Sequence, residues 1–324
     1  MAKAIRFDRT GGPEVLRYED VTLGDPGPGE VRLRHRAVGL NFIDTYHRSG
    51  LYPVPLPSGL GLEAAGVVEA VGEGVAHLAP GDRVAFGTGA LGAYATESVR
   101  AAEQLIRIPD GVDDETAAAI MLKGMTAAYL LTQTRPVGPG DTILLHAAAG
   151  GTGLLMVQWA RHLGARVIGV VGNEEKAELV RAHGCDEVVV RGRDDLVARV
   201  RELTDGAGVP VVYDSVGRAT FEASLDCLAP RGMFVSFGNA SGPVDKVIPA
   251  QLAAKGSLYF TRPTLASYAR TREELEGLAG AVLRLVGEGV LKVRIEQRFP
   301  LAEAARAHEA LESGQTRGAT ILQP

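Results

Sequence analysis

The sequence of 324 residues predicts an α/β protein in which a doubly wound parallel sheet is inserted into a β-rich, partly open barrel. Three observations lead to this expectation. Residues 1 to about 121 carry short strand patterns separated by turn signals, and residues from about 123 to 258 alternate between strand and helix patterns. After about residue 259 the pattern is mixed again. We expect this last part to pack on the first, so that the middle part is an insertion.

Strand patterns in the first region are short and regularly interrupted. They lie at residues 4–7, 30–37, 63–71 and 83–86. Gly- and Pro-rich turns separate them, at 11–13, 24–29, 72–74 and 80–82. Many short strands with such turns are typical of a partly closed antiparallel barrel.

The middle region alternates strands with helices, which predicts a parallel sheet covered on both faces. The expected strands are 142–146, 166–171, 187–190, 209–214 and 231–237, and the expected helices are 152–163, 174–183, 194–203 and 219–228. The last region is expected to contain helices 271–288 and 301–313 and strands 294–299 and 319–322.

The turn between the first strand and the first helix of the middle region consists of small residues. Gly150 has no Cβ, so a diphosphate can approach its backbone, and Gly153 lets the helix pack closely on the strand. Free N–H groups of Gly151 and Thr152 then face the anion. Ala148 stands where the first Gly of a dinucleotide-binding turn is usual, and a ligand-free joint is the alternative. The following strand completes a βαβ unit, which favours a dinucleotide-binding Rossmann fold.

Composition places the chain among globular proteins and excludes several functions. Hydrophobic residues make up 46% and charged residues 23%, and the net charge is −5. Because basic residues are scattered, we expect no nucleic-acid partner. Two lone cysteines fit a reducing compartment, and neither a signal core nor a membrane-length apolar run is present, so we expect a cytoplasmic protein with no membrane partner.

Two segments resemble a family signature. Residues 41–53 (NFIDTYHRSGLYP) and 57–66 (PSGLGLEAAG) are similar to the NADPH:quinone oxidoreductases, the zeta-crystallin branch of the medium-chain dehydrogenase/reductases. The similarity continues through 122–127, 146–153, 213–217, 235–239, 255–263 and 307–312. It implies a GroES-like catalytic domain of residues 1–122 and 262–324. It also implies a Rossmann NADPH-binding domain of residues 123–261, with the cofactor in the cleft between the two.

The residues offer no recognisable metal site. Zinc alcohol dehydrogenases of this superfamily carry Gly-His-Glu where this chain has Gly61-Leu62-Glu63, and leucine has no donor atom. Asn41 lies where those enzymes place an early cysteine ligand, and two cysteines cannot form a four-cysteine zinc lobe. The seven histidines show no ligand spacing. We therefore expect no metal, and an acceptor that takes hydride readily, such as a quinone.

The end of the second Rossmann strand favours NADPH over NADH. Gly172, beside Asn173, replaces the acidic residue that usually binds the ribose hydroxyls, and so leaves room for a 2′-phosphate. Lys176 lies in the next helical turn, and Arg191 stands where the family has a phosphate-facing Tyr. Both cations can pair with phosphate. The acidic pair 174–175 is the contrary evidence.

The resemblance implies further site residues. The expected cofactor contacts are Thr126, Ser215, Phe237, Gly238, Asn239, Phe260, Thr261, Arg262 and Arg317. The expected substrate side consists of Asn41, Asp44, Tyr46 and Tyr52. Asn41 is a candidate to bind a ribose, the nicotinamide edge or a quinone oxygen, the tyrosines offer flat rings and O–H donors, and Asp44 is a candidate to orient Tyr46 or water. The alternative is that 41–52 is a structural loop with buried tyrosines.

Other functions stay open on the sequence alone. Relatives reduce activated C=C bonds of enals or enones, and others are non-catalytic NADPH-binding crystallins or bind RNA. The acidic balance and the lack of an aromatic-basic motif count against RNA. The resemblance also implies a homodimer that pairs sheet edges near 232–237 and 257–261.

Overall fold

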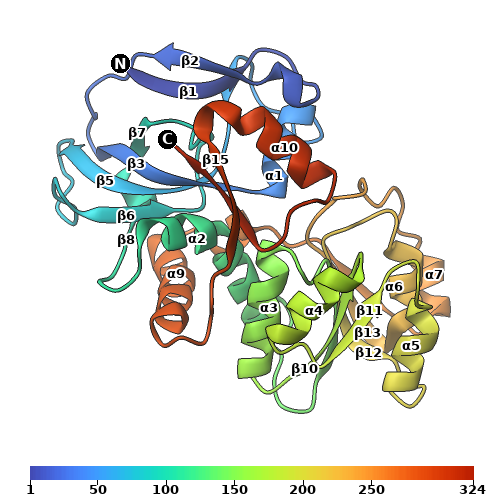
Figure 1. Cartoon of the computed structure of the whole chain (residues 1–324). Coiled ribbons are helices and arrows are strands. Elements are labelled where there is room, and N and C mark those ends of the chain that lie inside the picture. Colours follow the sequence, from blue (N-terminus) through green and yellow to red (C-terminus); the bar gives the residue numbers. More distant parts are fainter. The chain divides into compact units, whose positions relative to one another are not determined.

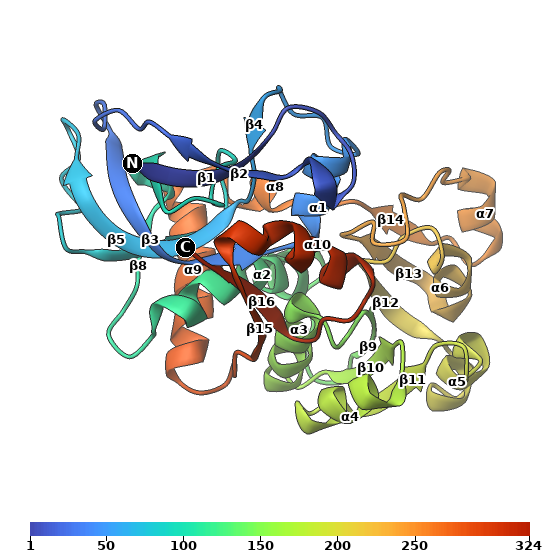
Figure 2. The ribbon, with the colours of Figure 1, turned by 45° about the horizontal axis from the view of Figure 1, so that its top comes forward.

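The computed structural model describes all 324 residues, which form two compact units (Figures 1 and 2). The first unit consists of Met1–Thr126 and Tyr268–Pro324, and the second unit of Ala127–Ser267. The second unit thus interrupts the first in sequence. The sequence predicts these boundaries slightly earlier, at 122/123 and 261/262.

The second unit is built on one six-stranded parallel sheet with the order β11-β10-β9-β12-β13-β14. Its strands are β9 (Thr142–His146), β10 (Arg166–Val171), β11 (Glu187–Val190), β12 (Val209–Asp214), β13 (Leu228–Ser236) and β14 (Tyr259–Thr261). Ile143, Leu144 and Leu145 of the central strand β9 are all fully buried, because helices cover both faces. The doubly wound parallel sheet predicted from the sequence is confirmed.

The helices of the second unit mostly follow its strands. They are α3 (Gly151–His162), α4 (Glu174–Ala182), α5 (Leu196–Leu203), α6 (Phe221–Cys227) and the short α7 (Pro249–Ala254), followed by α8 (Leu265–Tyr268) at the unit's end. Val200 of α5 and Phe221 of α6 pack on one sheet face with Leu144, Ile168 and Val212. Figure 1 shows α5 and α6 (yellow to light orange) beside strands of this sheet.

The order of the strands creates a crevice at one edge of this sheet. The chain runs outward from β9 through β10 to β11 and then returns to place β12 on the other side of β9, where Val211 pairs with Ile143. The loops after β9 and β12 therefore leave the same edge in opposite directions. In open α/β sheets ligands bind at such a switch point, outside the carboxyl ends of the strands.

The first unit contains two sheets around a separate core. One is three-stranded, with the order β2-β1-β4, and the other has the order β15-β16-β3-β5-β6-β8, with β7 also paired to β3. The strands are β1 (Ala2–Phe7), β2 (Arg17–Val21), β3 (Glu30–Leu40), β4 (Ser58–Gly59), β5 (Glu63–Val71), β6 (Arg83–Phe86), β7 (Glu97–Ala101), β8 (Ile106–Arg107), β15 (Ile295–Pro300) and β16 (Ala319–Gln323). β16 pairs antiparallel with β3, so the chain's last strand completes the sheet of its first part.

The first unit contains four longer helices, of which the sequence predicts two. They are α1 (Phe42–Ser49), α2 (Asp114–Tyr129, which crosses the unit boundary), α9 (Arg272–Gly287) and α10 (Ala304–Glu312). The sequence predicts α9 and α10 but not α1 or α2. The expectation of a β-rich region up to residue 121 was therefore wrong at its end: the side chain of Asp113 accepts a hydrogen bond from Thr116 N–H, and an alanine-rich run continues the helix.

Candidate functional site

The turn after β9 leaves backbone N–H groups free at the start of α3. Gly150 is the N-cap, in an extended conformation, and accepts the first intrahelical hydrogen bond from Leu154 N–H at 2.9 Å. The N–H groups of residues 151–153 precede that bond and have no partner within the helix. A Cβ on Gly153 would lie 2.4 Å from the Ala147 carbonyl oxygen, so only glycine permits this packing. The turn fits a diphosphate group.

The residues expected at a 2′-phosphate lie together at the ends of β10 and β11. Gly172 is exposed, and Arg191 Nη2 lies 4.0 Å from the point where a Cβ on Gly172 would stand. The Arg191 backbone N–H donates to Val171 O at 2.9 Å, which fixes this approach. The Asn173 side chain accepts from the backbone N–H of Lys176 at 2.9 Å and so caps α4. The guanidinium of Arg191 has no hydrogen-bond or ion-pair partner.

The neighbouring charges are already neutralised. Glu174 pairs with Arg181 at 2.8 Å and with Arg193, and Arg193 also pairs with Asp194 at 2.8 Å. These contacts lower the pKa of Glu174 through hydrogen bonds from both arginines. Glu174, one of the two acidic residues that argued against a phosphate, therefore pairs with arginines. Arg193 is occupied, while Arg191 is not.

The loops after β12 and β13 approach each other closely. A Cβ on Gly238 would lie 2.6 Å from the carbonyl oxygen of Ser215, so this approach requires glycine. Phe237 N–H donates to Asp214 O at 2.8 Å, and Ala240 N–H donates to Ser215 O at 3.1 Å. Ser215, Phe237, Gly238 and Asn239 thus form one backbone-linked group at the carboxyl edge of the sheet.

At the end of β14 the three expected residues differ in role. The ring of Phe260 stacks on Phe234 with centroids 5.5 Å apart and meets Phe221 edge-on at 6.2 Å. Its side chain therefore serves the core of the sheet. Thr261 follows in the strand, and Arg262 is exposed, with Nη1 donating to Pro263 O at 3.0 Å.

A buried polar cluster beneath the switch point was not predicted. His146 Nε2 lies 2.8 Å from Ser224 Oγ and 3.8 Å from Asp214 Oδ2. Asp214 Oδ1 accepts the N–H groups of Val216 and Gly217 at 2.7 and 2.8 Å. Burial lowers the pKa of His146. The cluster joins the ends of β9 and β12 and so holds Ser215 in place; the only signal in the sequence was a polar residue at each strand end.

In the first unit, the residues expected on the substrate side lie on or near α1. Tyr46 and Tyr52 meet edge-on with centroids 5.2 Å apart, Phe42 lies 5.8 Å from Tyr46, and Tyr52 N–H donates to Tyr46 O at 3.0 Å. Tyr46 is buried and Tyr52 is half-buried. The segment is thus a helix followed by a packed turn rather than a loop, while the burial of Tyr46 agrees with the structural alternative. The structure brings the two tyrosines together.

Asp44 is placed differently from the expectation that it contacts Tyr46 or water near a substrate. It is fully buried, and its Oδ2 accepts from Asn41 N–H and from the Tyr94 hydroxyl, each at 2.9 Å. Burial raises the pKa of Asp44 to about 7. Its established contacts are therefore those of a helix-capping residue inside a buried network.

Asn41 belongs to a second buried group, which contains a charge pair. Glu63 Oε2 accepts from Lys123 Nζ at 2.7 Å and from Asn41 Nδ2 at 2.8 Å, and Oε1 accepts from Leu122 N–H at 2.7 Å. The three side chains come from β5, α2 and the start of α1. Glu63 and Lys123 lie in segments of the family signature, but no local sequence pattern relates residues this far apart in the chain.

The two remaining expected residues of the first unit lie apart in the fold. Thr126 is half-buried on α2, and its hydroxyl donates to Leu122 O at 2.8 Å. Arg317 lies before β16, with Nη2 3.6 Å from Glu296 Oε2. Both contacts leave the residues partly accessible.

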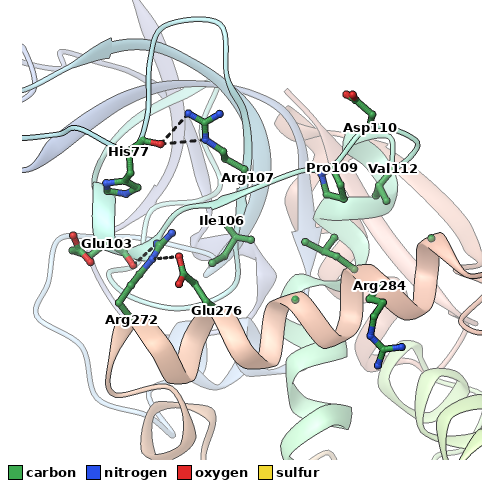
Figure 3. A pocket seen from close by; sticks show the side chains of 13 residues that line it. His77, Glu103, Ile106, Arg107, Pro109, Asp110, Val112, Arg272, Glu276 and Arg284 are labelled. Carbon is green, nitrogen blue, oxygen red and sulfur yellow. Dashed lines mark hydrogen bonds and ion pairs between the residues drawn. The ribbon is translucent and has the colours of Figure 1, made fainter.

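A cavity of about 920 Å³ lies elsewhere in the first unit (Figure 3). Arg272 of α9 donates to Glu103 O and Leu105 O at its wall, and Arg107 donates to His77 O. None of the expected site residues lines it. It is therefore not the candidate site.

The structure contains neither a cluster of metal-ligand side chains nor a helix that could cross a membrane. No group of three or more His, Cys, Asp or Glu side chains is arranged to hold a metal ion. None of the helices combines the length and the apolar character needed to cross a membrane.

Comparison with known families matches both parts of the chain. Residues 27–139 match the alcohol dehydrogenase GroES-like domain, and residues 151–281 match the zinc-binding dehydrogenase family. The second description refers to zinc, whereas Leu62, which by the family resemblance stands where the zinc enzymes carry a ligating histidine, has no donor atom.

Individual relatives cover the whole chain. A quinone oxidoreductase of Pseudomonas aeruginosa is 58% identical over 100% of both chains. A 2-haloacrylate reductase of a Burkholderia species is 48% identical over 100% of this chain and 99% of its own. The crystal structure of Escherichia coli quinone oxidoreductase complexed with NADPH has 49% identity and a TM-score of 0.98, covering 99% of this chain and 100% of that one.

Full-length identity, both domain matches and the strand order agree with each other. The chain therefore belongs to the quinone oxidoreductase family of the medium-chain dehydrogenase/reductases.

Proposed function

We propose that the chain is an NADPH:quinone oxidoreductase, which transfers hydride from NADPH to a quinone. The observation that carries the proposal is the full-length identity of 58% to a quinone oxidoreductase. The fold also matches the structure of a relative complexed with NADPH, with a TM-score of 0.98. Fold alone would not assign an activity. Identity at this level over both units supports one.

The residues of the second unit fit the cofactor. Gly150 and Gly153 keep side chains away from a diphosphate, whose charge the free N–H groups of α3 offset. Open space at Gly172 and the unpaired guanidinium of Arg191 suit a 2′-phosphate, and a carboxylate there would repel it. We propose that Lys176 and Asn173 complete this end, and that the rest of NADPH contacts Ser215, Phe237, Gly238, Asn239, Phe260, Thr261 and Arg262. We propose the same role for Thr126 and Arg317, which belong to the first unit.

When bound, NADPH supplies the hydride and its electron pair. The protein's part is to bind and orient both reactants and to exclude water. We propose that Tyr46 and Tyr52 provide flat faces for the quinone ring and O–H donors for the oxygen that gains negative charge. The proposed reaction uses no metal ion, because the ligand positions of the zinc enzymes hold Leu62 and Asn41 here.

A second activity is supported by one comparison. The 2-haloacrylate reductase at 48% identity reduces, by its name, a substrate with an activated C=C bond, and the same hydride transfer would serve an enal or enone. A non-catalytic crystallin or RNA-binding role is less well supported, because the net charge is −5 with basic residues scattered along the chain.

We further propose a cytoplasmic homodimer. Cys185 and Cys227 are free and buried, as thiols are in a reducing compartment. β14 forms an edge of the parallel sheet, and Tyr259 on it is 58% exposed. An apolar open edge suits pairing with a second copy. Sedimentation velocity on the wild type and on Tyr259→Lys tests this, and a wild-type monomer would reject it.

One assay separates the activities. NADPH absorbance is followed with a quinone, with an enone or haloacrylate, and without acceptor. We expect rapid oxidation with the quinone, a higher kcat/KM for NADPH than for NADH, and no loss after dialysis against a chelator. A higher kcat/KM for the enone would favour the second activity, and no oxidation with any acceptor would favour a binding role.

A further inference from the structure

The side-chain amide of Asn41 can face a ligand with either its nitrogen, a donor, or its oxygen, an acceptor. Asn41 is 5% exposed and precedes α1. Its Nδ2 donates to Glu63 Oε2 at 2.8 Å, and a second, longer contact joins Nδ2 to Gly39 O at 3.5 Å. Both N–H bonds of the amide therefore point into the protein.

Glu63 allows only this orientation of the amide. Its carboxylate is wholly buried and accepts from Leu122 N–H and from Lys123 Nζ, each at 2.7 Å. A turned Asn41 amide would bring its oxygen against the carboxylate, and two acceptors at 2.8 Å repel and leave buried groups unpaired. The Lys123 ammonium, 7% exposed, supplies the charge that keeps Glu63 in place.

The backbone is shaped around this carboxylate. Gly39 pairs with Glu63 across β3 and β5, and a Cβ on Gly39 would lie 2.1 Å from Glu63 Oε2. The Asn41 N–H donates to Asp44 Oδ2 at 2.9 Å, which fixes the residue at the N-cap of α1. The capping box of α1 also brings the Asn41 side-chain oxygen to the backbone N–H of Asp44. Asn41 is thus held at its backbone and at both ends of its amide, and Oδ1 keeps one lone pair for a ligand.

We infer that Asn41 presents only its Oδ1 atom to a ligand, and that Glu63 and Lys123 are the positioning residues that set this polarity. The inference rests on the proposed function. An acceptor binds a hydroxyl or an amide N–H, which the nicotinamide riboside half of NADPH carries. It repels a quinone oxygen, which has no proton and gains negative charge on reduction. Asn41 therefore serves the cofactor and not the quinone.

Binding measurements with two ligands test the assignment. Calorimetric titration gives the Kd of NADP⁺ and of adenosine 2′,5′-bisphosphate, which lacks the nicotinamide half. For Asn41→Ala we expect the Kd of NADP⁺ to rise about tenfold, the scale of one lost hydrogen bond. The Kd of the bisphosphate and the KM for the quinone at saturating NADPH should stay within about twofold. An unchanged Kd for NADP⁺ with a raised KM for the quinone would overturn the inference.

Glu63→Gln tests the positioning step, because glutamine leaves the Asn41 amide free to turn. We expect the same loss of NADP⁺ affinity, no change for the bisphosphate, and no further loss in the double variant with Asn41→Ala, since both act through one contact. Glu69→Gln is the matched control, as this exposed residue of β5 pairs only with surface arginines. Additive losses, or weaker bisphosphate binding, would reject positioning.

Two further measurements distinguish a folding defect, and a failure of the proposed function, from a failure of the inference. Thermal melts show whether Glu63→Gln folds; if it does not, Asn41→Ala with the two ligands still decides the polarity. Wild-type protein that binds neither ligand would contradict the proposed function itself, an outcome distinct from all of those above.

Discussion

The Tyr94 hydroxyl donates to the Asp44 carboxylate at 2.9 Å inside the first unit, 50 residues apart in the chain. His308 Nε2 lies 3.1 Å from the same hydroxyl, and its Nδ1 lies 2.9 Å from Arg48 Nη1. Because arginine can only donate, His308 accepts at Nδ1 and carries its proton on Nε2. The hydrogen bonds thus all point the same way, from Arg48 through His308 and Tyr94 to Asp44 of α1. Arg48 also pairs with Glu312 of α10 at 2.7 Å.

Tyr94→Phe should destabilise the protein by about 1–3 kcal/mol, because the buried Asp44 and His308 each lose a partner. The Tyr94 hydrogen bond also lowers the pKa of Asp44 against the larger effect of burial, so its loss raises that pKa further. Urea unfolding measures the change. Tyr18→Phe, at an exposed residue of β2, is the control and should not change the stability. Equal stabilities of the two variants would show that the hydrogen bonds of the Tyr94 hydroxyl contribute nothing to the free energy of unfolding.

His308→Gln should make the free energy of unfolding depend less steeply on pH on the acid side. Burial, with a smaller contribution from Arg48, lowers the pKa of His308 to about 3, whereas its unfolded value is 6.5. Between these values the unfolded chain binds the extra proton, so this residue's contribution to stability is complete above pH 6.5 and is lost as the pH falls towards 3. Unfolding free energies between pH 4 and 6 should differ in slope by about 1.4 kcal/mol per pH unit between wild type and variant. A variant with the wild-type slope would contradict a neutral, buried His308.

Gly39→Ala should prevent or severely weaken folding of the first unit. The added Cβ would lie 2.1 Å from Glu63 Oε2 and 2.3 Å from Ala118 O, and neither group has room to move. Gly277→Ala on the exposed face of α9 is the matched change. It has nothing within 4 Å and should stabilise by about 0.5–1 kcal/mol. Thermal melts of both decide; a Gly39→Ala protein with unchanged Tm would contradict the geometry around Glu63.

Arg191→Ala should lower the ratio of kcat/KM for NADPH to that for NADH by about tenfold or more, the scale of a charge-assisted hydrogen bond to phosphate. Values for NADH should not change. Arg193→Ala is the control, since Glu174 and Asp194 already occupy that guanidinium. A larger effect at Arg193 than at Arg191 would show that the 2′-phosphate lies elsewhere.

Tyr46→Phe should lower kcat modestly, about tenfold at most, because a quinol oxygen can take its proton from water. Stopped-flow reduction of a quinone at saturating NADPH measures the step, with Tyr18→Phe as the control. Complete loss of turnover with NADPH binding intact would instead identify Tyr46 as an essential acid.

The amino-acid sequence by itself determined the parallel sheet, the glycine turn at 150–153 and the family signature at 41–66. Apolar runs such as 142–145 report burial on both faces, and glycines report places without room for a Cβ. The resemblance of these motifs to the family also predicted that Asn41 and Arg191 belong to the cofactor site.

Tertiary structure alone decided what those side chains can do. Asp44 is buried beneath Tyr94, and the Asn41 amide is turned by Glu63, 22 residues away, whose charge is held by Lys123, a further 60 residues along the chain. Periodicity reports which residues are buried but not which partners they meet, because hydrogen bonds and ion pairs between distant segments form only when the chain folds.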